Sequence, residues 1–320
     1  MAIVDSQALK YRIWAGLLSI YLVWGSTYLA IRFAVQTIPP FIMAGTRFLV
    51  AGLIVFTWRR LAGDALPTVK QCRSAAIVGL FLLLGGNGLV VWAEQRVVSS
   101  VTALMIGSVP LFVVVVELFW PGRSRPNWKV LAGVLSGFIG IAILIGPSQL
   151  MNRSQSIDHI GATALLFASL FWAIGSIYAS QAELPDSPLM GTSIEMLAGA
   201  GGLLLFGTLM GEWSRLNLDR ISGQSWFGLL YLIIFGSLVG FASYSWLLRV
   251  APIALVSTYA YINPLVAVFL GNLIAKEPIT WQIMLSSIVI ISSVALIHSV
   301  RFAPYRVLKK VTSANPPTED

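Results

Sequence analysis

The chain alternates between long apolar segments and short connectors that carry most of its charges. Each apolar segment has about 20 residues, the length of helix that crosses a bilayer core roughly 30 Å thick. The segments are apolar on every face, as from Phe112 to Val116, and lack the alternation of a membrane-spanning strand. The pattern predicts an all-α membrane protein with ten transmembrane helices, which begin near Arg12, Pro39, Ser74, Ser99, Trp128, His159, Pro188, Ser225, Ala251 and Trp281.

The composition supports a membrane protein. Hydrophobic residues make up 57% of the chain and charged residues 11%, whereas a soluble domain has about 25% charged residues. The excess of Lys and Arg would also suit nucleic acid, but these residues lie between the apolar segments, as membrane topology requires. We therefore expect the lipid bilayer, and no nucleic acid, as a partner. The single cysteine, Cys72, excludes an intramolecular disulfide.

The basic residues predict the orientation. If the N-terminus is cytoplasmic, fourteen of the 21 Lys and Arg residues lie on the cytoplasmic side and one, Arg47, lies within a span. Cytoplasmic connectors are the ones enriched in Lys and Arg, so we expect both termini in the cytoplasm. The six basic residues on the other side are Arg32, Arg96, Arg153, Arg215, Arg220 and Lys276.

The two halves of the chain share landmarks in the same order. Proline opens the second and the seventh span, and a tryptophan precedes a proline by eighteen residues in each half, as the pairs Trp92/Pro110 and Trp246/Pro264 show. A repeat of five spans must insert its second copy from the opposite face, which gives an inverted repeat with a site near the midplane. We expect the first repeat over residues 1–147, the second over 157–300, and a disordered cytoplasmic tail over 301–320.

Arg47 and Glu195 are charged residues inside corresponding spans. Each follows the proline that opens its helix, Pro40 or Pro188, by seven residues, which places both roughly 10 Å deep. A charge at that depth is costly unless it is paired or hydrated. The two residues are either a structural ion pair or separate anchors that join the halves, or a coupling site in which Glu195 binds a proton.

Polar and aromatic residues inside the spans are candidates for a substrate cavity. Asn87 lies among glycines, and the run from Ser257 to Pro264 is the most polar and aromatic part of any span. Pro110 and Pro264 are expected to kink their helices. We predict that Asn87, Tyr244, Tyr259 and Asn263 meet the polar groups of a substrate, and that apolar walls come from Trp24, Trp92, Trp172 and Trp246.

Other motifs are less specific. Gly133 and Gly137 form a small-xxx-small pattern, which suits either a contact within one subunit or a homodimer seam. The sequence holds no metalloprotease, nucleophile-elbow or Walker motif, so we expect no enzyme activity, no metal and no cofactor.

These features together resemble the drug/metabolite transporter superfamily, in its ten-helix exporter branch with two EamA repeats. The likeness runs from about Trp14 to Ile297 and implies an inverted five-plus-five fold, cytoplasmic termini in a bacterial inner membrane, and a central cavity. One departure is the end of the fourth span, Glu117 to Pro121, which lacks a Gly-Glu pair. The residues that carry the resemblance are Trp24 to Tyr28, Pro39-Pro40, Arg47-Phe48, Gly86-Asn87-Gly88, Ala93-Glu94, Val109-Pro110-Leu111, Ser193 to Met196 and Ser257 to Pro264.

The sequence therefore predicts a transporter that exports small amphipathic metabolites, amino acids or related compounds, by alternating access, with proton coupling as one way to drive it. The alternatives are a flippase for lipids or lipid-linked precursors, and a facilitator that needs no gradient. A membrane enzyme would need clustered catalytic groups, and a sensor would normally carry a larger soluble domain.

Overall fold

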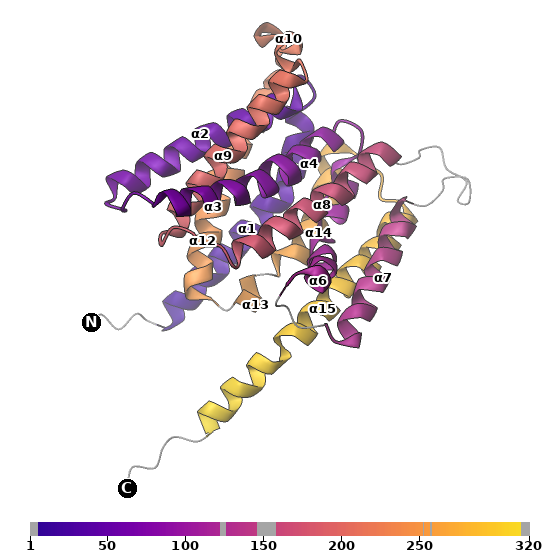
Figure 1. The fold of residues 1–320 in the computed structure, drawn as a ribbon. Helices are drawn as coiled ribbons and strands as arrows, with labels where there is room; N and C mark the ends of the chain where they lie inside the picture. The colour runs from indigo at the N-terminus through magenta and orange to yellow at the C-terminus, as the bar shows by residue number, and fades with distance from the viewer. Residues whose placement is uncertain (1–5, 122–125, 146–157, 252, 257, 315–320) are drawn as a thin grey trace.

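The computed structural model describes residues 6–121, 126–145, 158–251, 253–256 and 258–314, and these form helices without any strand (Figure 1). Ser257, Arg123, Arg125, Arg153 and the predicted repeat boundaries at 147 and 157 lie outside the described residues. The first half contains α1 Ser6–Ala34, α2 Pro40–Leu61, α3 Val69–Gly79, the π-helix η1 Leu80–Asn87, α4 Gly88–Ala93, α5 Ser99–Ile106, α6 Val109–Phe119 and α7 Trp128–Ile145.

The second half follows a similar order. We expected a disordered tail to begin at residue 301, but the last helix continues as far as Ala314. The elements are α8 His159–Ala179, α9 Pro188–Leu209, α10 Glu212–Arg215, the 3₁₀ turn η3 Leu218–Arg220, α11 Gly223–Tyr231, the π-helix η4 Leu232–Val239, α12 Gly240–Val250, α13 Ile253–Val256, α14 Tyr259–Ala275 and α15 Trp281–Ala314.

Nine helical segments in the described part of the chain are long and apolar enough to cross a membrane. The ninth expected span, from Ala251 onward, differs because it is split into α13 and the shorter apolar helix α14. At the break, the Thr258 hydroxyl and backbone N–H both donate to the Leu255 carbonyl. A threonine that bonds its local backbone in this way competes with the regular helical pattern.

Two spans contain a π-helical segment of eight residues, η1 in the third span and η4 in the eighth. Such segments are rare and often lie at functional sites, because they displace side chains and free backbone carbonyls. The positions correspond in the two halves of the chain.

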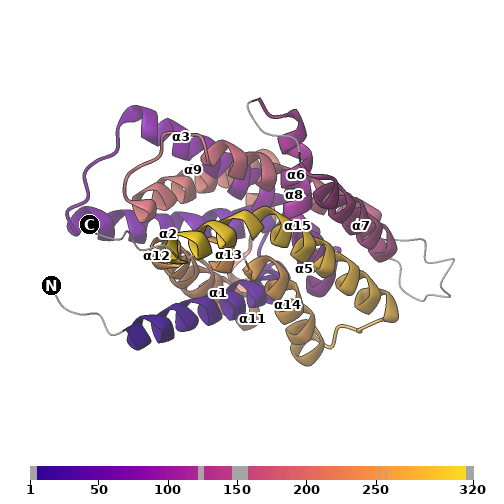
Figure 2. The ribbon, with the colours of Figure 1, turned by 90° about the horizontal axis from the view of Figure 1, so that it is seen from below.

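Helices from the two halves pack against each other. α2 packs along α9 and α7 along α15, while α1 contacts α11, α12 and α14. In the same manner α8 contacts η1 and α4 from the third span and α5 and α6 from the fourth. Seen from below, α7 and the first part of α15 lie on one side of the bundle, and α3 lies on the other (Figure 2). The start of α1 and the end of α15 project from the same side (Figure 1).

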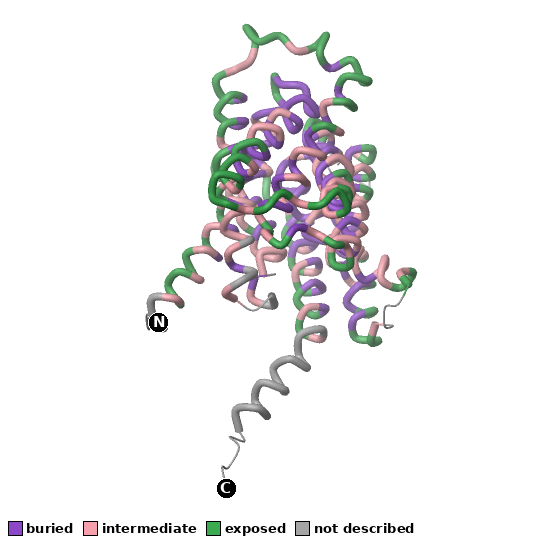
Figure 3. The backbone as a smooth tube through the Cα atoms, turned by 60° about the vertical axis from the view of Figure 1, so that its left-hand side comes forward, coloured by how far each residue is buried: buried purple, intermediate pink, exposed green. Residues whose placement is uncertain are grey.

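Buried residues lie inside the bundle and exposed ones on its periphery (Figure 3). Many exposed side chains within the spans are large and apolar, such as Leu135, Phe167 and Phe269. A protein with so many apolar side chains on its surface would aggregate in water. The natural surroundings of these side chains are therefore lipid.

The glycines of α7 are used within the subunit. A Cβ at Gly133 would lie 2.8 Å from Ile297 Cγ1, and one at Gly140 would lie 2.8 Å from Ile290 Cγ1. Both partners belong to α15, so this face of α7 is already covered. The small-xxx-small pattern of α7 thus makes a contact within one subunit.

Candidate functional site

A cavity of about 240 Å³ lies between α6, α8, α14 and α15. Its lining comes from the last part of α8, the first part of α14 and the middle of α15, so the cavity lies in the half of the bundle nearer the projecting ends of α1 and α15. The lining residues are Val109, Pro110, Val113, Trp172, Ser176, Tyr259, Ala260, Tyr261, Val294, Ile297 and His298.

The cavity is lined by a mixture of apolar, aromatic and polar groups. The rings of Tyr261 and His298 meet edge to face with centroids 5.8 Å apart. Hydroxyl, imidazole and indole groups beside aliphatic side chains suit a small ligand with an apolar body and a few polar atoms.

Tyr259 also belongs to an aromatic cluster that surrounds Trp24. Ring centroids of Tyr259, Tyr244 and Phe241 lie 5.1, 5.2 and 5.5 Å from that of Trp24. Trp24 Nε1 donates to the Gly236 carbonyl at 3.2 Å, inside the π-helix η4. Gly240 permits this arrangement, since a Cβ there would overlap the Trp24 indole.

The helix break before Pro110 lies close to Pro264, the second predicted kink residue. The fourth span is interrupted between α5 and α6, immediately before Pro110. Pro264 lies inside α14, and the ninth span is interrupted earlier, before Tyr259. A Cβ at Gly107 would lie 2.7 Å from Pro264 Cγ, so the break in the fourth span packs directly against Pro264.

The other predicted substrate residues are not among those that line this cavity. With its amide oriented to satisfy both atoms, Asn263 donates to the Tyr259 and Tyr21 carbonyls at 3.2 and 3.3 Å, which ties α14 to α1. Trp92 stacks with the Arg96 guanidinium, and Trp246 packs beside Gly16 of α1. Asn87 Oδ1 is buried and has no hydrogen-bond partner among the described residues.

Arg47 and Glu195 are not joined by an ion pair anywhere in the part of the chain that the structure describes. Arg47 is 4% exposed, and its Nε donates to Ser237 Oγ of η4 at 2.9 Å. The geometry therefore matches the reading of separate anchors better than that of a pair. Sequence reasoning missed Ser237, because a single serine in an apolar span carries no distinctive signal.

A polar cluster joins three elements at the opposite end of the bundle. Arg32 Nη1 at the end of α1 lies 2.5 Å from Glu277 Oε1, in the connector between α14 and α15. The same oxygen accepts from the backbone N–H and hydroxyl of Ser99 at 3.0 and 2.7 Å, and Oε2 accepts from the Ser100 N–H at 3.0 Å. We call Arg32, Glu277, Ser99 and Ser100 the clasp.

Glu277 acts as a cap supplied from a distant part of the sequence. Its carboxylate meets the first N–H groups of α5, which lack partners within the helix. Burial raises the pKa of Glu277, but hydrogen bonds from Ser100 and Ser99 and the charge of Arg32 outweigh burial and bring the pKa below its ordinary value. Glu277 is thus an ionised group at neutral pH.

Glu94 lies one residue past the span that ends at Ala93. Its boundary position favours a solvated carboxylate or a pair with Arg96, but the side chain is buried, with 4% exposure, and both oxygens lack a hydrogen-bond partner in the described structure. Arg96 lies instead 3.9 Å from Asp158. Burial raises the pKa of Glu94 well above its ordinary value, the Glu277 carboxylate raises it further, and Arg32 opposes both.

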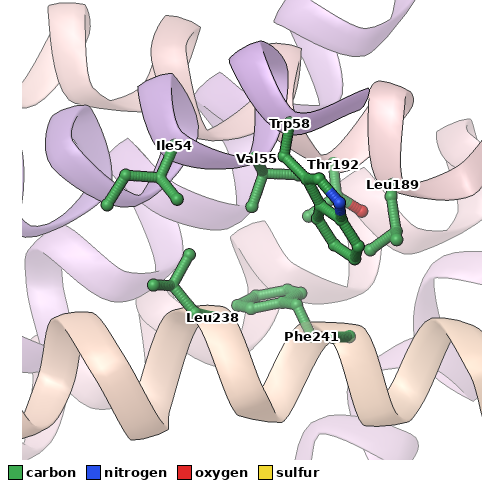
Figure 4. A pocket seen from close by; sticks show the side chains of 8 residues that line it. Ile54, Val55, Trp58, Leu189, Thr192, Leu238 and Phe241 are labelled. Carbon is green, nitrogen blue, oxygen red and sulfur yellow. The ribbon is translucent and has the colours of Figure 1, made fainter. Parts of the chain in front are cut away.

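A second cavity of about 170 Å³ lies between α2, α9, η4 and α12 and is almost entirely apolar (Figure 4). Trp58 and Phe241 point into it from opposite sides, and Thr192 supplies a hydroxyl. Trp58 is 51% exposed, so the cavity is open towards the periphery.

His298 lines the first cavity but was not among the predicted site residues. The apolar run of its span ends shortly after it, but α15 continues to Ala314, which places His298 well inside its helix. The apolar run ends early because the tail is polar, and hydropathy alone cannot show that the helix goes on.

Comparison with known proteins identifies the fold and the class. The description "EamA-like transporter family" applies to residues 12–146 and 159–299. The chain belongs to this family. The two matched segments fall in the two halves of the chain, which have a similar order of helices.

Individual EamA relatives are similar over most of the chain. The uncharacterized inner membrane transporter YedA of Escherichia coli K12 is 37% identical over 261 residues, which are 81% of each chain. The uncharacterized transporter YoaV of Bacillus subtilis is 24% identical and covers 81% of this chain and 87% of its own. One solved crystal structure, 18% identical, superposes with a TM-score of 0.60 over 90% of this chain and 97% of its own, and shares the fold.

The protein is therefore a membrane transporter of the drug/metabolite transporter superfamily, similar to YedA. Its apolar helices and its similarity to an inner membrane transporter make it a multi-pass inner membrane protein.

Proposed function

We propose that this EamA protein exports small amphipathic metabolites, amino acids or related compounds, by alternating access. The observation that carries the proposal is the 240 Å³ cavity with its aromatic, hydroxyl and imidazole lining. Pockets for drug-sized ligands measure roughly 300–1,000 Å³, so this volume suits a smaller molecule.

Alternating access needs a site that is open to one side at a time. The cavity lies towards the chain termini, and the clasp holds α1, α5 and the α14–α15 connector together at the other end. With cytoplasmic termini, this arrangement fits a state that loads substrate from the cytoplasm. The orientation is part of the proposal and rests on the distribution of Lys and Arg.

The two halves are proposed to form an inverted repeat. The packing supports this, because the second span contacts the seventh and the fifth contacts the tenth, while the first span contacts the eighth and ninth as the sixth contacts the third and fourth. The π-helices η1 and η4 occupy corresponding spans. Such exchange of contacts is what a two-fold relation between repeats produces.

Substrate contact is proposed for Trp172 and Tyr259 of the cavity. Trp24 and Tyr244 would support Tyr259 from behind, through ring contacts of 5.1 and 5.9 Å. Pro110 and Pro264 would allow bending where the fourth and ninth spans meet.

A second candidate function is transport of a lipid or lipid-linked molecule. The apolar cavity between α2, α9 and α12 favours it, since its lining suits an acyl chain and it opens towards the periphery (Figure 4).

Counterflow of labelled amino acids into proteoliposomes tests the proposal. We expect exchange by the natural protein, and a roughly tenfold or greater loss in Trp172→Ala, because removing a large aromatic anchor typically costs more than 1 kcal/mol of binding. Phe269→Ala is the matched control, since this ring lies on α14 but is 63% exposed.

Equal rates in the two variants would remove the cavity from the transport path. No exchange across the panel, with movement of fluorescent lipid between leaflets, would favour the second candidate. Exchange that no pH gradient can drive to accumulation would make the protein a facilitator.

A further inference from the structure

Glu94 is a buried carboxyl group that the proposed substrate path does not use. Both of its oxygens are buried without a hydrogen-bond partner among the described residues. An ionised carboxylate in that position would lose its hydration and gain no bond in return, at a cost of several kcal/mol. The arrangement in this structure therefore fits the neutral, protonated acid.

The groups that act on Glu94 come from two other elements. Tyr28 and Arg32 belong to α1, and Glu277 belongs to the α14–α15 connector. Arg96, two residues along the chain, is directed to Trp92 and Asp158 instead. Glu94 thus lies beside a cation that is already shared with another carboxylate.

Glu277 can lose Arg32 without becoming an isolated buried charge. It would keep three hydrogen bonds, two from Ser99 and one from Ser100, together with the N-terminal end of α5. An ionised Glu94 has only the backbone of Arg32 close by and would gain its one strong side-chain partner by attracting the Arg32 guanidinium. The two carboxylates are therefore unequal competitors for one guanidinium.

We propose that Glu94 is a proton-binding site of this transporter, and that loss of its proton draws Arg32 from Glu277 and loosens the clasp. The proton leaves the Glu94 carboxyl group for water on the cavity side of the bundle, and the next proton binds from water at the clasp end once that end is open, so that a cycle carries a proton from one side to the other. Binding of a proton there restores the Arg32–Glu277 pair and closes that end. A substrate gradient and a proton gradient then act on the same conformational change.

The inference rests on the proposed transport function, but its first test does not need a substrate. Infrared spectra of the full chain in nanodiscs are recorded against pH, and the C=O stretch of protonated carboxylic acid is followed. The natural protein should show a band that persists above about pH 4.3, the ordinary pKa of glutamate, and disappears only at higher pH. In a Glu195→Gln background, which removes the other glutamate considered as a proton site, Glu94→Gln should lack the band, whereas the control Asp158→Asn should keep it.

Two further variants remove the two neighbouring charges, which should shift the midpoint of the band in opposite directions. Removing the cation in Arg32→Gln should move the midpoint of the band to higher pH, and removing the competing anion in Glu277→Gln should move it to lower pH. A band that persists in Glu94→Gln in the Glu195→Gln background, or midpoints that do not move, would overturn the inference.

The transport test measures accumulation driven by a pH gradient against counterflow without one. Glu94→Gln should retain counterflow and lose the gradient-driven accumulation, and Glu195→Gln should retain both. Loss of gradient-driven accumulation in Glu195→Gln alone would assign coupling to Glu195 and refute the inference. A titrating Glu94 in a protein that moves none of the substrates would instead refute the proposed function and leave the proton site standing.

Discussion

A guanidinium buried at the position of Arg47 requires a fixed acceptor, because the charge cannot reach bulk water from the middle of a span. The acceptor is the Ser237 hydroxyl, on the π-helix that also receives the Trp24 indole through Gly236. Arg47 and Trp24 thus fasten the second and first spans to the same segment of the eighth.

Ser237→Ala should destabilise the folded protein by about 1.5–3 kcal/mol, the usual worth of a hydrogen bond to a charged group. Ser193→Ala is the control: Ser193 is also fully buried, but its hydroxyl bonds the carbonyl and the Sδ atom of Met190 in its own helix. Thermal unfolding in detergent, followed by tryptophan fluorescence, compares the two. Equal melting temperatures would mean that the Arg47–Ser237 bond contributes nothing.

At the scale of elements, the clasp holds the beginning of α5 by means of a carboxylate from outside the helix. A negative charge near a helix N-terminus contributes up to about 2 kcal/mol in partly buried geometry. Asp158 makes the local version of this cap on α8, where its Oδ1 accepts from the Gly161 N–H at 2.6 Å. The two caps provide a matched comparison.

Glu277→Gln should lower the free energy of unfolding by about 2 kcal/mol at neutral pH. Because the pKa of Glu277 is lower in the folded state, its contribution is present above the ordinary carboxyl pKa and is lost as pH falls through the lowered value. The difference between variant and natural protein should therefore shrink below about pH 4. Asp158→Asn should lower the free energy of unfolding by less, about 1 kcal/mol. If the loss of stability in Glu277→Gln did not depend on pH, Glu277 would not act as an ionised group.

At the scale of the whole molecule, the helices of the described chain bring the start of α1 and the end of α15 to one side of the bundle (Figure 1). Which side of the membrane this is determines the direction in which the 240 Å³ cavity opens. The excess of basic residues on the connectors of that side favours the cytoplasm.

Fusion of alkaline phosphatase to the C-terminus should give no enzyme activity in intact cells, whereas fusion of a green fluorescent protein should give fluorescence. A matched pair of fusions after Arg220, in a connector at the clasp end, should behave in the opposite way. The reverse result at both sites would invert the orientation and turn the proposed exporter into one that loads from outside.

The sequence was sufficient for the class of fold, because the bilayer imposes its requirement on every span separately. Helices of suitable length and landmarks repeated in order are properties of local sequence, and the EamA resemblance needed no tertiary information. Pro110, Trp172 and Tyr259 were chosen from such local patterns, and the fold brings them to one cavity.

Partnerships between distant residues were decided only in the tertiary structure. The equal depth of Arg47 and Glu195 suggested an ion pair as one interpretation. Depth leaves the direction around the helix axis undetermined, and the fold turns Arg47 to Ser237. Glu94 lies at the end of a span, where water is the usual neighbour, but α1 and the α14–α15 connector cover it. Hydropathy measures how far a residue lies along the membrane normal, and only packing determines which side chain it meets there.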